Sequence, residues 1–296
     1  MPAAARTSID GRPPVTGSTT MSEITASTIV ELNDKLRHAR EELEHYGELL
    51  LMIQKAILPQ QLPSVPGLDL AVHFADADGP GGDFYDVHPI GPYHWAIVIA
   101  DVCGHGLAAA AILGLVHALA NAVQDQQGPT APAAALALIN RPLATRYLAD
   151  TGQFVTAFVG LFDATSQVLT YSCAGHPPPR LVRGSEVRRL NAASGLPLGI
   201  EESCEYWNGT LHLLAGDRLV LFTDGMTEST NAAHDLFGDN RLDAVLTAPV
   251  SSAAELLDRT VDSVRTFRAG RPADDDETCL VAVVKCGLSA TPEFRK

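Results

Sequence analysis

The sequence predicts an α+β fold in which antiparallel sheets are packed together and covered by helices. Apolar, β-branched runs at 154–163, 168–175 and 180–190 follow one another with connections too short for a crossover helix. Such strands pair as antiparallel hairpins, which excludes a doubly wound parallel sheet. Long helices are expected at 106–124 and 252–268, where they would cover the sheets.

The remaining elements are predicted from hydrophobic periodicity and from the Gly, Asp and Pro residues that bound most of them. Pro142 should start or kink its helix, because proline has no amide hydrogen to donate. Further strands are expected at 70–74, 95–102, 211–224 and 278–285, and further helices at 132–148 and 238–247.

The chain divides into four predicted segments. Residues 1–22 are rich in Pro, Ala, Ser, Thr and Gly without periodicity, which is typical of a disordered tail. Residues 23–58 are expected to form a coiled-coil or linker helix, residues 66–286 a folded domain, and residues 287–296 a C-terminal tail.

The helix expected at 23–58 carries a continuous heptad pattern, with apolar residues spaced alternately three and four positions apart. Such a pattern favours pairing with a second helix, so we expect a homodimer through residues 29–57. The alternative is an amphipathic helix packed on its own domain. The apolar positions are Ile29, Leu32, Leu36, Ala39, Leu43, Tyr46, Leu50, Ile53 and Ile57.

The charge of the chain excludes several functions. It has 35 acidic and 21 basic residues, a formal net charge of −14, which argues against binding to nucleic acid or to anionic membranes. The N-terminus lacks the apolar core of a signal peptide, and we expect no apolar run of the about 18 residues that span a membrane. These observations predict a cytoplasmic protein.

The cysteines are odd in number and have no CxxC spacing, so we expect reduced thiols instead of disulfides or a zinc site. They are Cys103, Cys173, Cys204, Cys279 and Cys286.

Four Gly- and Asp-rich segments lie where apolar strands meet turns. One Asp-Gly pair is most often a plain turn, but converging carboxylates repel one another unless a cation lies between them. Oxygen ligands favour Mg²⁺ or Mn²⁺ over zinc. No Lys or Arg lies between Lys55 and Arg141, so metal ions would have to neutralise a phosphate bound there. The segments are GGDFYD at 81–86, DVCGHG at 101–106, TDGMTE at 223–228 and DDDET at 274–278.

The order and the residues of these segments resemble the motifs of the SpoIIE/RsbU-like branch of the PP2C (PPM) metal-dependent serine/threonine phosphatases. The resemblance runs from about Gln54 to Lys285. It includes QKAILPQQLP, GGDFYD, DVCGHG, FVTAFVGLFD, AGHPPP, PLG, TDGMTES, and DDET followed by an apolar strand.

This resemblance implies a PP2C-like αββα sandwich, two antiparallel sheets flanked by helices, with two Mn²⁺ or Mg²⁺ ions at one edge. By position, Asp101 would bridge both ions and the carbonyl of Val102 would bind one of them. Asp224 and Asp275 would hold the other ion, and Asp83 would reach the metals directly or through water. The expected catalytic residues are therefore Asp101, Asp224 and Asp275.

Some positions stay open within the resemblance. Asp276 is the alternative to Asp275, although the D-D-x-T spacing favours the latter. Asp86 is a weaker candidate ligand. His105 is either a leaving-group acid or a structural residue, and His176 is interpreted as a structural turn residue.

The sequence departs from the family pattern in two places. Cys103 stands where serine is usual, and no arginine near GGDFYD corresponds to the one that binds substrate phosphate in eukaryotic relatives. The metals, with a partner-supplied group, would therefore have to hold the phosphate.

The expected activity is hydrolysis of phosphoserine or phosphothreonine, since paired divalent ions lower the pKa of a bound water and generate hydroxide. The resemblance further suggests a STAS-type anti-sigma-factor antagonist as the substrate, in bacterial partner-switching signalling and stress response. The alternative is a catalytically inactive dimeric scaffold with the same fold, which the retained aspartates disfavour. A dinucleotide site at Gly104, Gly106 and Ala109 is disfavoured because Asp101 would repel a pyrophosphate.

Overall fold

The computed structural model describes residues 21–77, 79–127 and 131–285. The tail expected at 287–296 lies outside the described residues, and so does all but the end of the tail expected at 1–22. The chain divides into two units, Met1–His45 and Tyr46–Lys296. Helix α1, Met21–Ile57, accounts for the described part of the first unit, and its last turns belong to the second.

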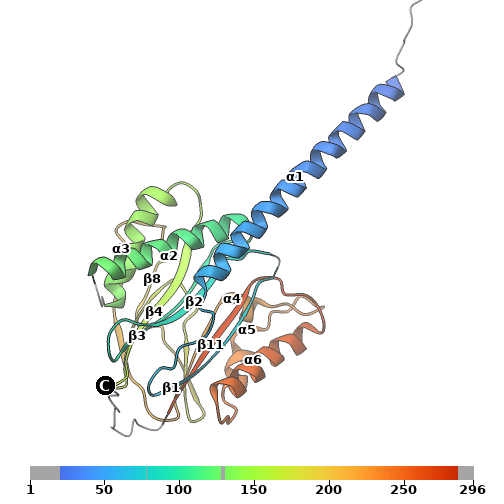
Figure 1. Ribbon diagram of the computed structural model, residues 1–296. Helices are drawn as coiled ribbons and strands as arrows, with labels where there is room; N and C mark the ends of the chain where they lie inside the picture. Colours follow the sequence, from blue (N-terminus) through green and yellow to red (C-terminus); the bar gives the residue numbers. More distant parts are fainter. Residues whose placement is uncertain (1–20, 78, 128–130, 286–296) are drawn as a thin grey trace, which may run out of the picture. The chain divides into compact units, whose positions relative to one another are not determined.

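The second unit contains two sheets (Figure 1). Sheet 1 has the strand order β1-β11-β10-β6-β7, and sheet 2 the order β2-β3-β4-β5-β8, with β9 also paired to β5. Neighbouring strands are antiparallel except β5 and β8. The strands are β1 Leu68–Ala75, β2 Asp83–Pro89, β3 His94–Val102, β4 Val155–Asp163, β5 Val168–Ala174, β6 Arg180–Arg183, β7 Glu186–Arg189, β8 Ser194–Gly195, β9 Gly209–His212, β10 Arg218–Phe222 and β11 Glu277–Val284.

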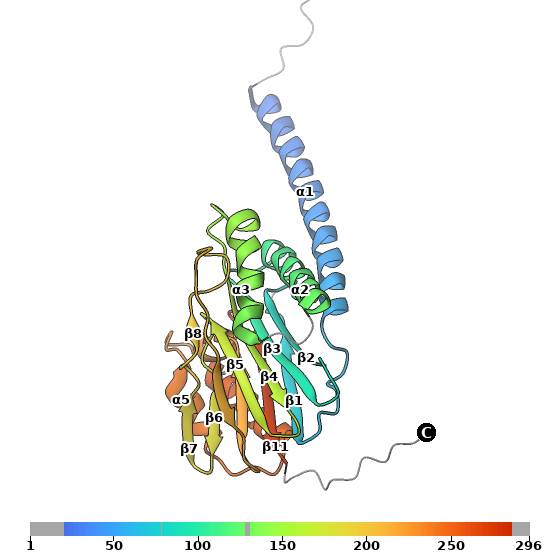
Figure 2. The same cartoon turned by 90° about the vertical axis from the view of Figure 1, so that its left-hand side faces the viewer.

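Helices cover the outer face of each sheet, so the predicted αββα sandwich is confirmed. Helices α2 and α3 pack on sheet 2 (Figure 2), and helices α5 and α6 pack on sheet 1 (Figure 1). The helices of this unit are α2 Leu107–Gln127, α3 Pro132–Pro142, the short π-helix Leu143–Tyr147, α4 Asp224–Glu228, α5 Gly238–Leu246 and α6 Ala253–Arg268.

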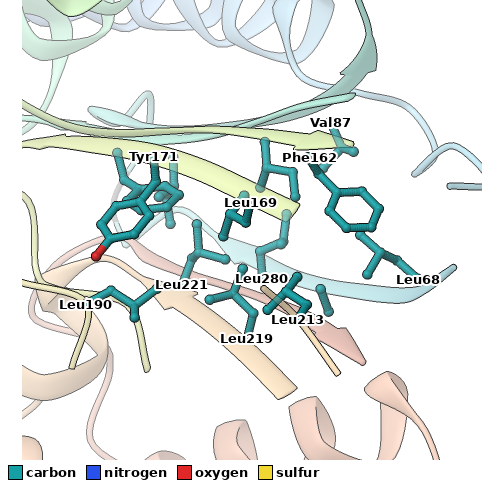
Figure 3. Close-up of a cluster of buried hydrophobic side chains, with 14 of the residues drawn as sticks. Leu68, Val87, Phe162, Leu169, Tyr171, Leu190, Leu213, Leu219, Leu221 and Leu280 are labelled. Atoms are coloured by element: carbon teal, nitrogen blue, oxygen red, sulfur yellow. The ribbon is translucent and has the colours of Figure 1, made fainter. Parts of the chain in front are cut away.

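The central strands read as unbroken apolar runs because both of their faces are buried. In β3, Ile97 and Ile99 enter the core between the sheets, whereas Ala100 and Val102 pack beneath the helices. Figure 3 shows the layer between the sheets, where leucines of β10 and β11 face Phe162 and Leu169 of sheet 2.

Two expectations about the strands are wrong, and one strand was not expected. The strand expected at 180–190 is a hairpin, β6–β7, because Gly184 adopts a left-handed conformation (φ 61°) that turns the chain. The strand expected at 211–224 is broken at Gly216, so β9 and β10 lie in different sheets. The strand that was not expected is β2, which starts at Asp83 within GGDFYD.

The predicted hairpin between 168–175 and 180–190 is also wrong, because AGHPPP carries the chain from sheet 2 to sheet 1. At its end, Arg180 is fully buried and forms ion pairs with Asp239 and Asp243 of helix α5, at 2.6 and 2.7 Å. Its guanidinium also donates to the carbonyl of Pro178 and stacks on Phe222. The buried charge thus anchors the crossover to sheet 1 and to α5.

Pro142 is the last residue of helix α3 and is followed by a π-helical turn, so it does not start a helix, and the expected kink stays a prediction.

Helix α2 contradicts the expectation that no segment has the length and hydropathy of a membrane span. Residues Leu107–Asp125 meet that test, and among the described residues they form the one helix that does. One face of this helix, including Ala109, Leu113 and Val116, is part of the core on sheet 2. Its apolar composition is therefore explained in part by its place in the fold, and the test is weak evidence for a membrane.

Candidate active site

Two aspartates lie opposite each other on neighbouring strands of sheet 2. Asp83, the first residue of β2, pairs in register with Asp101, the penultimate residue of β3. Because side chains alternate along a strand, Asp83 shares a face with Tyr85 and Val87, which are in the core between the sheets. Both carboxylates therefore lie at the edge where sheet 2 meets sheet 1.

Two threonine hydroxyls of sheet 1 bind the buried Asp83 carboxylate. Thr223, directly after β10, donates to Asp83 Oδ2 at 2.8 Å, and Thr278 of β11 donates to the same oxygen at 2.6 Å. The Thr278 amide in turn donates to the Thr223 hydroxyl at 3.0 Å. These bonds join segments that are 140 and 195 residues apart, so the two sheets are tied together beside the acidic cluster.

The side chain of Asp276 accepts hydrogen bonds from two backbone amides. Its Oδ1 accepts from the Ala77 amide and its Oδ2 from the Gly82 amide, both at 2.9 Å, and the residue is only 6% exposed. Asp275, the next residue towards the N-terminus, is exposed. This arrangement supports Asp275 over Asp276 as a metal ligand, an assignment that stays a prediction.

Glycine is required where the chain passes Asp276. A Cβ at Gly81 would lie 1.9 Å from Asp276 Oδ2, and a Cβ at Gly225 would lie 2.0 Å from the Asp276 carbonyl oxygen. Any side chain would force the acidic segments apart. The glycines of GGDFYD and TDGMTE therefore serve close packing around the site.

The carboxylates destabilise one another's charged forms. Burial, followed by the charges of Asp224, Asp275 and Asp276, raises the pKa of Asp101 to about 7. Burial and then Asp101 hold the pKa of Asp83 well above its usual range, although the threonine hydroxyls oppose this. The pKa of Asp224 is raised by burial and then by two further carboxylates, those of Glu228 and Asp275. Such an arrangement favours a bound cation, which would relieve the repulsion.

The donors fit a hard divalent ion, since they are carboxylates and the Val102 carbonyl. The Val102 amide donates to the Gly82 carbonyl at 3.2 Å, so the two predicted metal-binding segments are directly linked. In the described part of the chain, no three His, Cys, Asp or Glu side chains form a ready metal-ligand group. The ligand assignments to Asp83, Asp101, Val102, Asp224 and Asp275 therefore stay predictions.

The other sequence candidates have different surroundings. Asp86 is three residues from Asp83 and so faces the opposite side of β2, where it bonds His88 at 2.6 Å. His105 is exposed. His176 is 3% exposed and its Nδ1 lies 2.8 Å from the Thr156 hydroxyl, which agrees with a structural role.

The sequence reasoning missed several polar groups of the site. Thr223 and Thr278 belong to the motifs TDGMTES and DDET, but spacing alone does not show that both reach Asp83. Glu228 adds to the charge that raises the pKa of Asp101. Gln54 also contacts the loop before Asp83. It begins the segment QKAILPQQLP of the resemblance, but that segment alone does not show which groups its amide reaches.

Comparison with known proteins identifies a family. Residues 91–285 match the family model described as Stage II sporulation protein E (SpoIIE). The chain is 27% identical to the phosphoserine phosphatase RsbP of Bacillus subtilis, over 80% of this chain and 57% of RsbP. It is 26% identical to the phosphoserine phosphatase RsbU of the same organism, over 81% of this chain and 70% of RsbU.

The match covers only part of some relatives. The chain is 28% identical to Protein IcfG of Synechocystis over 70% of this chain, but that match spans only 36% of IcfG.

Solved structures show the same fold. The PP2C domain of SiaA from Pseudomonas aeruginosa superposes with a TM-score of 0.74 at 24% identity, covering 83% of this chain and 99% of that domain. The catalytic domain of the serine/threonine phosphatase PstP, solved with two manganese ions, has a TM-score of 0.54 at 19% identity and covers 74% of this chain and 99% of that domain.

Proposed function

Because the chain belongs to the SpoIIE family, we propose that it is a Mn²⁺- or Mg²⁺-dependent protein serine/threonine phosphatase. The observation that carries the proposal is the meeting of acidic residues from both sheets at one edge, with Asp83 bonded to Thr223 and Thr278. Two relatives bear the name phosphoserine phosphatase, and PstP was solved with two manganese ions.

Each group would have a defined task. Divalent ions, when bound, supply the positive charge for a phosphate and acidify a water to hydroxide. Asp101 would bridge the ions, and Asp224 and Asp275 would hold the second one. The threonine hydroxyls would orient Asp83 and oppose the rise in its pKa, since hydrogen bonds to a carboxylate stabilise its charged form.

The test is hydrolysis of p-nitrophenyl phosphate with Mn²⁺ and with EDTA. We expect activity that needs Mn²⁺ and falls by about 10²-fold or more in Asp101→Asn and Asp224→Asn. Asp86→Asn is the matched control, because Asp86 lies on the opposite face of β2. Activity unaffected by EDTA and by both substitutions would contradict the proposal, and a folded, inactive wild type would favour the scaffold alternative.

We also propose that the substrate is a phosphorylated STAS-type anti-sigma-factor antagonist in the cytoplasm. The support is the likeness to RsbU and RsbP. Release of phosphate from such a phosphoprotein should be faster than from a short phosphopeptide with the same serine. Equal rates would indicate that only the phosphoserine is recognised.

Finally, we propose a homodimer through residues 29–57. The heptad residues Ile29, Leu32, Leu36 and Leu43 are 49–58% exposed in the single chain, so they are available to a second helix. Light scattering should report a dimer for the full chain and a monomer for Leu36→Glu with Leu43→Glu. A control with Lys35→Glu, outside the apolar seam, should stay dimeric.

A further inference from the structure

Gln54 is a buried amide near the end of helix α1, within the second unit. It is 2% exposed, whereas the preceding residues Met52 and Ile53 are 62% and 46% exposed. A helix normally buries its apolar residues and leaves its polar ones in water. At this turn the polar residue is buried and the apolar ones are exposed, so the burial of Gln54 calls for hydrogen-bond partners.

Both ends of the amide are used. Its Nε2 donates to Asp76 Oδ1 at 3.0 Å, and its Oε1 accepts from the Gly81 amide at 3.1 Å. This pairing needs one donor and one acceptor on the same side chain, which an amide provides. A glutamate could accept from Gly81 but could not donate to Asp76.

The loop between β1 and β2 is therefore held by two side chains from other parts of the chain. Asp276 binds the amides of Ala77 and Gly82, and Gln54 binds Asp76 and the amide of Gly81. The loop ends at Asp83.

We propose that Gln54 is a positioning residue for the metal centre, an inference that rests on the proposed function. By fixing Gly81, it sets the path of the chain into Asp83. It also sets the position of the Gly82 carbonyl, which accepts from the amide of Val102, whose own carbonyl is a predicted ligand. Gln54 contacts neither the metals nor the substrate and acts through this loop.

The first test compares Mn²⁺ binding by calorimetry in the wild type, Gln54→Leu and Gln61→Leu. Groups that orient metal ligands from outside typically change affinity by 10–100-fold, so Gln54→Leu should bind Mn²⁺ about 10-fold more weakly or worse. Gln61 is exposed a few residues further on, and its variant should stay within about 2-fold of wild type. Equal affinity in all three proteins overturns the inference.

The second test exchanges the hydrogen-bonding groups. Gln54→Glu places a carboxylate against Asp76 and should weaken Mn²⁺ binding. Adding Asp76→Asn restores the bond in the reverse direction, because the amide at position 76 can donate to the carboxylate at position 54. The Mn²⁺ affinity should then return to within about 3-fold of wild type. A loss that the double variant does not recover overturns the proposed bond. This series also serves if Gln54→Leu does not fold.

A third measurement separates the inference from the proposed function. In metal-free protein, hydrogen exchange at the Gly81 amide should be about 10-fold faster or more in Gln54→Leu than in wild type, because leucine has no oxygen to accept from this amide. A wild type that binds no Mn²⁺ contradicts the proposed function, whereas unchanged exchange at Gly81 contradicts the role of Gln54.

Discussion

The bond between Thr278 and Asp83 gives the sharpest stability prediction. Thr278→Val keeps the shape of the side chain but removes the hydroxyl that donates to Asp83 Oδ2 at 2.6 Å. Thr278 is fully buried, so no water can replace this donor. A lost hydrogen bond to a charged group costs about 1.5–3 kcal/mol. At about 2–4 °C per kcal/mol, the melting temperature should fall by roughly 3–12 °C.

Thermal unfolding followed by circular dichroism in EDTA measures this effect. Thr278→Ser keeps the hydroxyl and should be more stable than Thr278→Val. Thr210→Val makes the same chemical change at an exposed position of β9 and should change stability by no more than about 0.5 kcal/mol. If Thr278→Val melts with the wild type, or if Thr278→Ser is the less stable of the two, the bond to Asp83 does not stabilise this edge.

Three further outcomes are expected. Gly225→Ala should destabilise the fold by about 1–3 kcal/mol in chemical denaturation, since its Cβ would lie 2.0 Å from a backbone oxygen. Arg268→Met should lower the unfolding free energy by about 3–5 kcal/mol, because it removes the cation of a buried ion pair at 2.6 Å and leaves the Glu277 carboxylate without it. Adding Glu277→Gln removes that buried charge and should recover part of the loss. Burial lowers the pKa of His176 to about 3. The folded state therefore cannot take the proton that the unfolded state binds below about pH 6.5, and stability falls as pH falls through that value. In urea titrations from pH 7.5 to 5.5, His176→Gln should lose about 1.4 kcal/mol less than wild type, and equal losses would contradict this assignment.

Sequence patterns predicted most elements to within a few residues where periodicity was long. Helix α6 was expected at 252–268 and spans Ala253–Arg268, because its apolar face and the Ser252 cap are local features. The connections were predicted less well. Nothing local distinguishes a hairpin from the crossover at AGHPPP, which depends on Arg180 meeting helix α5.

In the candidate site, too, local signals were predicted well and long-range contacts were not. The motifs singled out Asp83, Asp101 and Asp224 because glycines and aspartates at strand ends are local signals. Asp86 has a similar local setting, yet the alternation of β2 turns it to the opposite face.

The sequence by itself indicated the kind of ligand, since the carboxylates at the strand ends specify oxygen donors and no Lys or Arg lies between Lys55 and Arg141. Only the tertiary structure showed which side chains meet at this edge and which hold the backbone beside it. Asp276 and Gln54 bind the same loop, and in both cases a partner is a backbone amide distant in the sequence. Almost every residue has a backbone amide, so the sequence does not indicate which amide a given side chain will bind.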